Sequence, residues 1–135
     1  MSDLYQQHIL DHYRNPRNKR EIFDADVIER GKNASCGDDL TLYLKFTVRT
    51  DGSIDHTSNG TGDGEVVEDV AFGGDGCAIS TAAASLLTEK IKGMKKEEIR
   101  LLTPADIYDM LGVPISAGRS RCALLAYEAI ERGLK

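Results

Sequence analysis

Alternating hydrophobic and polar residues identify one β-strand in this chain with particular clarity. Along Leu40–Val48 every second side chain is apolar, so one face of the strand is predicted to be buried and the other wet. Asp51-Gly52 then gives a hairpin-turn signal, a weaker strand is expected at 53–57, and Val66–Phe72 predicts a third strand. The middle of the chain is therefore predicted to be an antiparallel meander with a glycine-rich tip.

Helical periodicity characterises the two ends of the chain. A first helix is expected over 3–14, ended by Pro16, and residues 15–35 are polar without a sustained period, so they are expected to be irregular. From Cys77 onward the apolar spacing becomes helical, which predicts helices at 77–92, 95–102, 104–111 and 120–134. Strands followed by helices predict an α+β fold, with helices packed on one face of a small antiparallel three-stranded sheet, in a single domain over 1–135.

Composition and charge argue against some classes of binding partner. The 17 basic and 22 acidic residues give a formal net charge of −5, which argues against nucleic acid as the main partner. No apolar run approaches the roughly 20 residues of a membrane span, and the N-terminus lacks the pattern of a signal peptide. We therefore expect a cytoplasmic protein that binds neither nucleic acid nor a membrane.

The three cysteines, Cys36, Cys77 and Cys122, are too far apart in the sequence to form a local pair. Their odd number does not favour a secreted disulfide framework, and in a reducing cytosol cysteines are more often reactive, metal-binding or buried. Neighbouring antiparallel strands should bring Cys36 and Cys77 to one end of the sheet, and a helix across the sheet could add Cys122. Asp38 would arrive with Cys36, so that three thiolates and one carboxylate form a metal or cluster site.

Each cysteine also has a simpler interpretation. Cys122 lies on the apolar stripe of its helix and Cys77 opens an alanine-rich helix, so both could be buried packing residues. Cys36 stands in a polar loop, where packing does not select cysteine. Both helical cysteines are expected in a first helical turn, where free backbone N–H groups favour a thiolate, and Arg119 and Arg121 add positive charge beside Cys122.

Four short motifs extend over nearly the whole chain: Leu4-Tyr5 with 9–18, Cys36-Gly37-Asp38, 76–80 and 121–126. In kind and order they closely resemble the iron–sulfur cluster assembly scaffolds of the IscU, SufU and NifU N-terminal type. The resemblance implies transient assembly of [2Fe–2S] clusters from iron and persulfide sulfur, which a pyridoxal-phosphate cysteine desulfurase supplies, followed by transfer to recipient apoproteins. The ligands that it implies are Cys36, Asp38, Cys77 and Cys122, and a single weak oxygen ligand among thiolates would ease release of the cluster.

Two departures from the family pattern concern gating and a chaperone. Arg121 stands where many IscU proteins carry histidine; arginine stays protonated and cannot bind a metal, so this SufU-like cation favours an Asp38–Arg121 interaction that gates ligand exchange. The proline-rich segment by which IscU engages a dedicated Hsp70 is replaced at 113–118, so the resemblance does not support that partner. Sharing of the cluster in a homodimer and the role of the extended hairpin at 50–64 stay open.

The same four ligands suit a second function. They could hold tetrahedral zinc in the cluster-free protein, as in a SufU-like sulfurtransferase, where a partner displaces one ligand and frees a thiolate as the persulfide acceptor. Cys36, Cys77 and Cys122 are all candidates for that acceptor. A scaffold is not a turnover enzyme, whereas this alternative is a sulfurtransferase. A third interpretation is a small binding domain with three buried cysteines.

Overall fold

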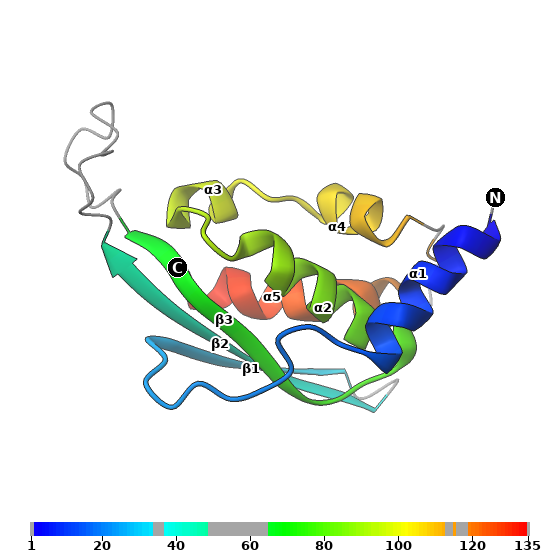
Figure 1. Cartoon of the computed structure of the whole chain (residues 1–135), viewed down its shortest axis with the longest axis horizontal. Coiled ribbons are helices and arrows are strands. Elements are labelled where there is room, and N and C mark those ends of the chain that lie inside the picture. The colour runs from blue at the N-terminus through cyan, green and yellow to red at the C-terminus, as the bar shows by residue number, and fades with distance from the viewer. Residues whose placement is uncertain (1, 34–36, 49–64, 113–114, 116–118, 135) are drawn as a thin grey trace.

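The protein combines a three-stranded antiparallel sheet with helices that lie together on one side of it (Figure 1). The computed structural model describes residues 2–33, 37–48, 65–112, 115 and 119–134. The strands follow the order β1-β2-β3, with β1 at Val27–Asn33, β2 at Asp38–Val48 and β3 at Glu65–Asp75. The helices are α1 (Ser2–Arg14), α2 (Ala78–Ile91), α3 (Lys96–Arg100), α4 (Pro104–Leu111) and α5 (Ser120–Gly133). This arrangement confirms the predicted α+β class with helices on one face of a three-stranded sheet.

The alternation along β2 sorts its side chains between the two faces of the sheet. Leu40, Leu42 and Leu44 are fully buried on the helix-covered face. On the neighbouring strand Phe72 stands opposite Leu42 and Val70 stands opposite Leu44, and both are also fully buried. Each fully buried leucine stabilises the fold by about 1.5–3 kcal/mol relative to an exposed one. The strand that the sequence predicted most clearly is therefore the centre of the core.

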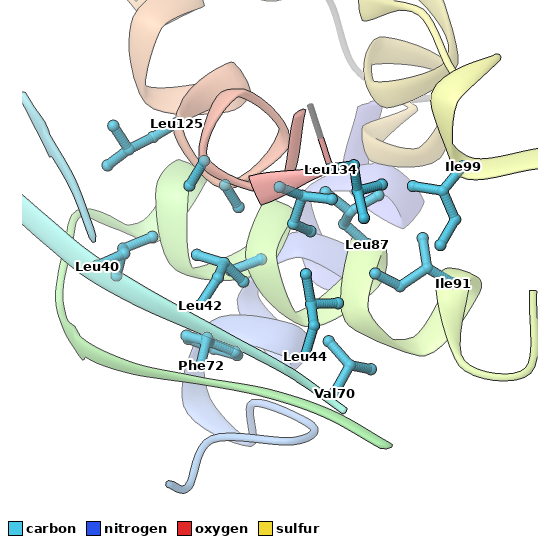
Figure 2. Packing of buried hydrophobic residues seen from close by; sticks show 14 of the residues in the cluster. Leu40, Leu42, Leu44, Val70, Phe72, Leu87, Ile91, Ile99, Leu125 and Leu134 are labelled. Atoms are coloured by element: carbon cyan, nitrogen blue, oxygen red, sulfur yellow. The ribbon is translucent and has the colours of Figure 1, made fainter. Parts of the chain in front are cut away.

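Helix α2 lies at the middle of the helical layer. It packs against α1, α4, α5 and β3, so it is buried on almost all sides. Figure 2 shows Leu87 and Ile91 of α2 and Leu125 of α5 in the same hydrophobic cluster as the leucines of β2. On the side of α2 nearest α1 and α4, Ala82 and Ala83 keep the helix narrow enough for these neighbours to approach. The alanine-rich composition of this segment thus serves helix–helix packing.

Capping residues define both ends of α4. The carboxylate of Asp106 accepts the backbone N–H of Thr103 at 2.8 Å, and Pro104 occupies the first helical turn. Gly112 ends the helix in the left-handed conformation with φ of 73°. The other helices also form near their predicted positions, although α3 is shorter than the predicted segment 95–102. None of the helices in the described part of the chain is long and apolar enough to cross a membrane.

One predicted region differs from the structure. Residues 15–35 were expected to be irregular, but they contain β1, which pairs along its whole length with β2. The prediction was wrong because the buried positions of β1 are Gly31 and Asn33, which are poor strand formers. The segment before β1 is also bound to the sheet, because Arg20 donates its N–H to the carbonyl of Phe72 at 2.9 Å. The strand predicted at 53–57 and the hairpin tip at 50–64 lie outside the described residues.

Two glycines allow α5 to lie close against β1. A Cβ atom at Gly31 would stand 3.1 Å from Leu125 Cδ1, and one at Gly133 would stand 2.5 Å from Val27 Cγ1. A side chain at Gly133 would therefore displace the side chain of Val27 and crowd that of Glu29, or push the helix away from the strand. The glycines fix the path of α5 across the sheet, and with it the position of Cys122 near the N-terminal end of that helix.

Candidate metal centre

The antiparallel pairing of β2 and β3 brings Asp38 beside Cys77. Asp38 is the first residue of β2, and Leu40 stands opposite Gly74 near the end of β3, so the residues after β3 arrive where β2 begins. Oδ1 of Asp38 accepts the backbone N–H of Cys77 at 2.8 Å. Residues 39 positions apart in the sequence are thus joined directly at one end of the sheet.

Cys77 is the N-cap residue of α2. Its backbone is extended, with φ of −71° and ψ of 175°, and its sulfur accepts the backbone N–H of Ser80 at 3.5 Å. The hydroxyl of Ser80 in turn donates to the carbonyl of Cys77 at 3.1 Å. The helix terminus therefore fixes the direction of this sulfur, as an N-cap side chain does when it satisfies a free N–H group.

Cys122 enters the same site from the first turn of α5. Its side chain is fully buried, and Asn33 at the end of β1 directs its amide Nδ2 toward the sulfur at 3.7 Å. One ligand atom from each of Asp38, Cys77 and Cys122 lies within 4.8 Å of the other two. Segments far apart in the chain thus converge on one point, as the ends of the predicted strands suggested.

The second carboxylate oxygen of Asp38 is well suited to a metal. Asp38 is 2% exposed, and its Oδ2 is buried with no hydrogen-bond partner among the described residues. A buried polar atom without a partner is unfavourable by about 1–3 kcal/mol, so its presence calls for a functional explanation. A tetrahedral ion bound at about 2.0–2.3 Å holds its ligand atoms about 3.5–3.8 Å apart, so the three groups need to close by only about 1 Å. The residues present fit a metal.

The other two predicted site residues are Cys36 and Arg121. Cys36 lies outside the described residues, two positions before Asp38 in the sequence. The expected ion pair between Asp38 and Arg121 is not formed, because the side chain of Arg121 is exposed whereas Asp38 is buried and directs Oδ1 to Cys77. Arg121 is therefore beside the site in sequence but not in contact with the carboxylate.

The approach to Cys77 depends on two glycines for steric reasons. A Cβ atom at Gly74, whose φ is +100°, would stand 2.1 Å from the carbonyl oxygen of Asp39. A Cβ atom at Gly76 would stand 2.2 Å from Ser80 Oγ and 3.4 Å from Asp38 Oδ1. These glycines let the protein's own backbone and ligands pack together.

Sequence reasoning did not identify Asn33 or Ser80. Asn33 lies in a segment that was expected to be irregular, and Ser80 follows Cys77 on a helix whose other small residues serve packing. The only available signal was proximity, because each stands three residues from a cysteine, Asn33 before Cys36 and Ser80 after Cys77. Such spacing is too common to point to a contact with sulfur.

The fold and the Asp–Cys–Cys site together define a class of proteins. The family model of the NifU-like N terminal domain matches residues 4–135, so this chain belongs to that family. Its relatives include proteins named as an iron–sulfur cluster assembly scaffold and as a zinc-dependent sulfurtransferase.

Three comparisons illustrate the similarity. The chain is 34% identical to the zinc-dependent sulfurtransferase SufU of Bacillus subtilis, over 99% of this chain and 91% of that protein. It is 34% identical to the iron–sulfur cluster assembly scaffold protein IscU of Thermotoga maritima, over 98% of this chain and 93% of that protein. A crystal structure from Fervidobacterium islandicum AW-1, described as a candidate SUF-system scaffold named FiSufU, superposes with a TM-score of 0.74 at 28% identity, covering 96% of this chain and 95% of that one.

Proposed function

We propose that this protein is a scaffold for the assembly of [2Fe–2S] clusters. The cluster is its cargo: it is built from iron and persulfide sulfur, held for a time and passed to recipient apoproteins. The partners are a pyridoxal-phosphate cysteine desulfurase, which supplies the sulfur, and the apoproteins that accept the cluster. Cluster assembly is proposed to take place in the cytoplasm, where reducing conditions keep cysteine thiols from forming disulfides.

The observation that carries the proposal is the buried Oδ2 of Asp38. It lies without a hydrogen-bond partner in the described part of the chain, and its carboxylate has an oxygen within 4.8 Å of two sulfurs that are not joined in a disulfide. A domain with merely buried cysteines has no use for an unpartnered carboxylate oxygen beside them. An iron or zinc ion would satisfy that oxygen and both sulfurs together.

We assign four ligands to the cargo: Cys36, Asp38, Cys77 and Cys122. Thiolates bind iron strongly, whereas a carboxylate oxygen is a harder and more easily exchanged ligand for an iron–sulfur cluster. A site with one such ligand retains the cluster less firmly than a site with four cysteines. This suits a protein that must release what it binds.

The exposure of the sulfurs favours Cys77 over Cys122 as a persulfide acceptor. Cys77 is partly exposed, whereas Cys122 is fully buried. In the proposed step the Cys77 thiolate attacks the outer sulfur of the persulfide on the desulfurase cysteine. The sulfur–sulfur bond of that persulfide breaks, and the desulfurase cysteine leaves as a thiolate. Cys36 stays a candidate on sequence grounds.

Arg121 is proposed to gate ligand exchange. Its guanidinium is exposed, one residue before Cys122, so a change of side-chain rotamer when a partner docks could bring it to Asp38. A pair with Arg121 would compete with the metal for the carboxylate and favour release. In this scheme the cluster-bound protein forms a homodimer only if the four ligands of one chain are insufficient to hold the cluster. The scheme includes no dedicated Hsp70 chaperone.

Anaerobic reconstitution tests the proposed function. The purified protein is incubated with ferrous iron, cysteine and a cysteine desulfurase, and the visible absorption and circular dichroism of a [2Fe–2S] cluster are followed. We expect cluster bands to grow in and to decay when an apo-ferredoxin is added, as that acceptor gains its own spectrum. A protein that forms no cluster bands under these conditions contradicts the scaffold function.

A second candidate function is that of a zinc-dependent sulfurtransferase. It is favoured by the tetrahedral fit of an Asp–Cys–Cys set to zinc and by the similarity to the Bacillus subtilis protein. In that case the purified protein carries zinc in the cluster-free form, stimulates desulfurase turnover and stays colourless in the reconstitution. The same experiment therefore separates the scaffold from the sulfurtransferase.

A further inference from the structure

A side chain that is not one of the proposed ligands contacts the sulfur of Cys122. Asn33 is the last residue of β1 and stands directly opposite Asp38 in the register of β1 and β2. It is 6% exposed, and its Nδ2 donates to Cys122 Sγ at 3.7 Å. The ends of β1, β2 and α5 thus meet at one sulfur and one carboxylate.

From this geometry we infer that Asn33 is a positioning residue, which orients Cys122 Sγ toward the metal and withdraws negative charge from it. The inference rests on the proposed role of Cys122 as a ligand. Partners of this kind fix ligand orientation and tune the bound metal, and their removal typically weakens metal binding by about 10–100-fold. N–H donors to ligand sulfurs also influence the reduction potentials of iron–sulfur clusters.

The surroundings of Cys122 show why this donor matters. On α5, the buried neighbours of Cys122 are Ala123, Leu125 and Ala126, which offer no side-chain donor. A buried amide is unfavourable by about 1–3 kcal/mol unless it is hydrogen-bonded. The contact with the sulfur of Cys122 therefore offsets part of the cost of burying the polar side chain of Asn33.

The two described sulfurs are supported in different ways. Cys77 Sγ accepts a backbone N–H from Ser80, which no substitution except proline removes, whereas Cys122 Sγ accepts from the side chain of Asn33. A single substitution at Asn33 therefore removes this side-chain donor to Cys122 and leaves the backbone donor to Cys77 in place. This difference makes the inference testable without altering a proposed ligand.

The test uses Co²⁺ as a spectroscopic probe of the metal-free protein, with Asn33→Leu as the variant. Leucine nearly matches the shape of asparagine and has no N–H donor. Lys32→Leu is the matched control, because it introduces the same side chain one position earlier on β1, where the residue is exposed. Co²⁺ affinity is measured by titration, and the energy of the thiolate-to-Co²⁺ charge-transfer band is recorded. Thermal unfolding of each metal-free variant verifies that it is folded.

We expect Asn33→Leu to weaken Co²⁺ binding by about 10–100-fold and to shift the charge-transfer band to longer wavelength, because a sulfur without its N–H donor is the stronger electron donor. Lys32→Leu should leave both unchanged. In a Cys122→Ala background, Asn33→Leu should have no further effect on affinity. Unchanged affinity and band position in a folded Asn33→Leu protein overturn the inference, and so does a loss that persists in the Cys122→Ala background. Wild-type protein without any thiolate-to-Co²⁺ band would instead contradict the proposed metal site itself.

Discussion

Asp38 accepts the backbone N–H of Cys77 through Oδ1 at 2.8 Å, while its Oδ2 is buried without a partner in the described part of the chain. One carboxylate oxygen thus belongs to the fold, since it links the start of β2 to the start of α2. The other oxygen is available to bind a metal. This division allows the two roles of Asp38 to be separated by substitution.

The structural role predicts a difference between two variants of the metal-free protein. Asp38→Asn keeps a carbonyl oxygen that can accept the Cys77 N–H, whereas Asp38→Ala leaves that N–H without its acceptor. We therefore expect Asp38→Ala to be less stable than Asp38→Asn by about 1–3 kcal/mol in denaturant unfolding. Equal stabilities of the two variants would show that the bond to Cys77 contributes nothing measurable.

The chemical role predicts slower release of the cluster from Asp38→Ala. The variant lacks the carboxylate oxygen, which is the exchangeable ligand of the proposed set, and leaves room for a stronger replacement ligand. Loss of the visible cluster absorption is followed under anaerobic conditions in the presence of an apo-acceptor or a chelator. Faster loss of the cluster than from wild type would mean that Asp38 retains the cargo and does not make it labile.

Each proposed thiolate ligand should be individually necessary. Cys36→Ser, Cys77→Ser and Cys122→Ser should each reduce iron and sulfide per chain to a small fraction of the wild-type content after anaerobic reconstitution. The reason is that a site with two thiolates and one carboxylate binds an iron–sulfur cluster poorly. A variant that keeps full occupancy excludes its cysteine from the ligand set.

Two adjacent glycines of β3 form a matched pair for testing the backbone path to the site. Gly74 has φ of +100°, and a Cβ atom there would lie 2.1 Å from the carbonyl oxygen of Asp39, whereas a Cβ atom at Gly73 would meet nothing within 4 Å. Gly74→Ala should therefore lower the free energy of unfolding by about 1–3 kcal/mol, since it combines backbone strain with a clash. Gly73→Ala should change it by no more than about 0.5 kcal/mol. Similar losses in both variants would contradict this distinction.

The contact between His12 and Ser85 predicts a loss of stability at acidic pH. His12 Nδ1 lies 2.7 Å from Ser85 Oγ, which also accepts the backbone N–H of Arg17 at 2.9 Å, so the serine proton is available for an unprotonated His12. Burial lowers the pKa of His12 below its usual 6.5, with a smaller contribution from the positive charge of Arg17. Below about pH 6.5 the unfolded chain therefore binds more protons than the folded one.

The sign of this effect can be checked by unfolding as a function of pH. The stability due to neutral His12 should be fully present above about pH 6.5 and lost as the pH falls toward the lowered pKa of the folded state. His12→Gln should flatten the pH dependence between about pH 7.5 and 5.5. His8→Gln is the comparison variant and should change the slope less, because His8 is exposed on the same helix and its charge contributes less than burial to the lowered pKa of His12. An unchanged slope in His12→Gln would assign the acid sensitivity to other groups.

The sequence predicts those parts of the fold whose pattern comes from burial on one face. The alternation of Leu40, Leu42 and Leu44 follows directly from a strand with one covered side, and the helix periods follow from the same cause. The hydrophobic pattern does not predict strand β1, because its buried positions are Gly31 and Asn33 and not large apolar residues. Leu125 packs against Gly31, and the amide of Asn33 contacts the sulfur of Cys122, so both positions serve tertiary contacts that a local sequence pattern does not reveal.

The site was predictable to the extent that strand ends are. Antiparallel neighbours bring the start of β2 and the end of β3 together, so the approach of Asp38 to Cys77 follows from the sequence once the two strands are recognised. The position of Cys122 depends on how α5 crosses the sheet, which no local pattern specifies. The sequence also could not predict that Asp38 is buried without an ion pair to Arg121. An aspartate and an arginine are expected whether the two side chains pair or the aspartate is buried by itself.

The close contact of α5 with β1 has a consequence for how the affinity of the site can be altered. Neither Gly31 nor Gly133 is itself a proposed ligand, yet both allow the close approach of the helix that carries Cys122 to the strand that ends at Asn33. A methyl group added at Gly133 would push the C-terminal end of α5 away from β1. Because α5 is rigid, this displacement would also shift the sulfur of Cys122. Selection for tighter or looser retention of a metal could therefore operate through positions that an inspection of the binding residues alone would overlook.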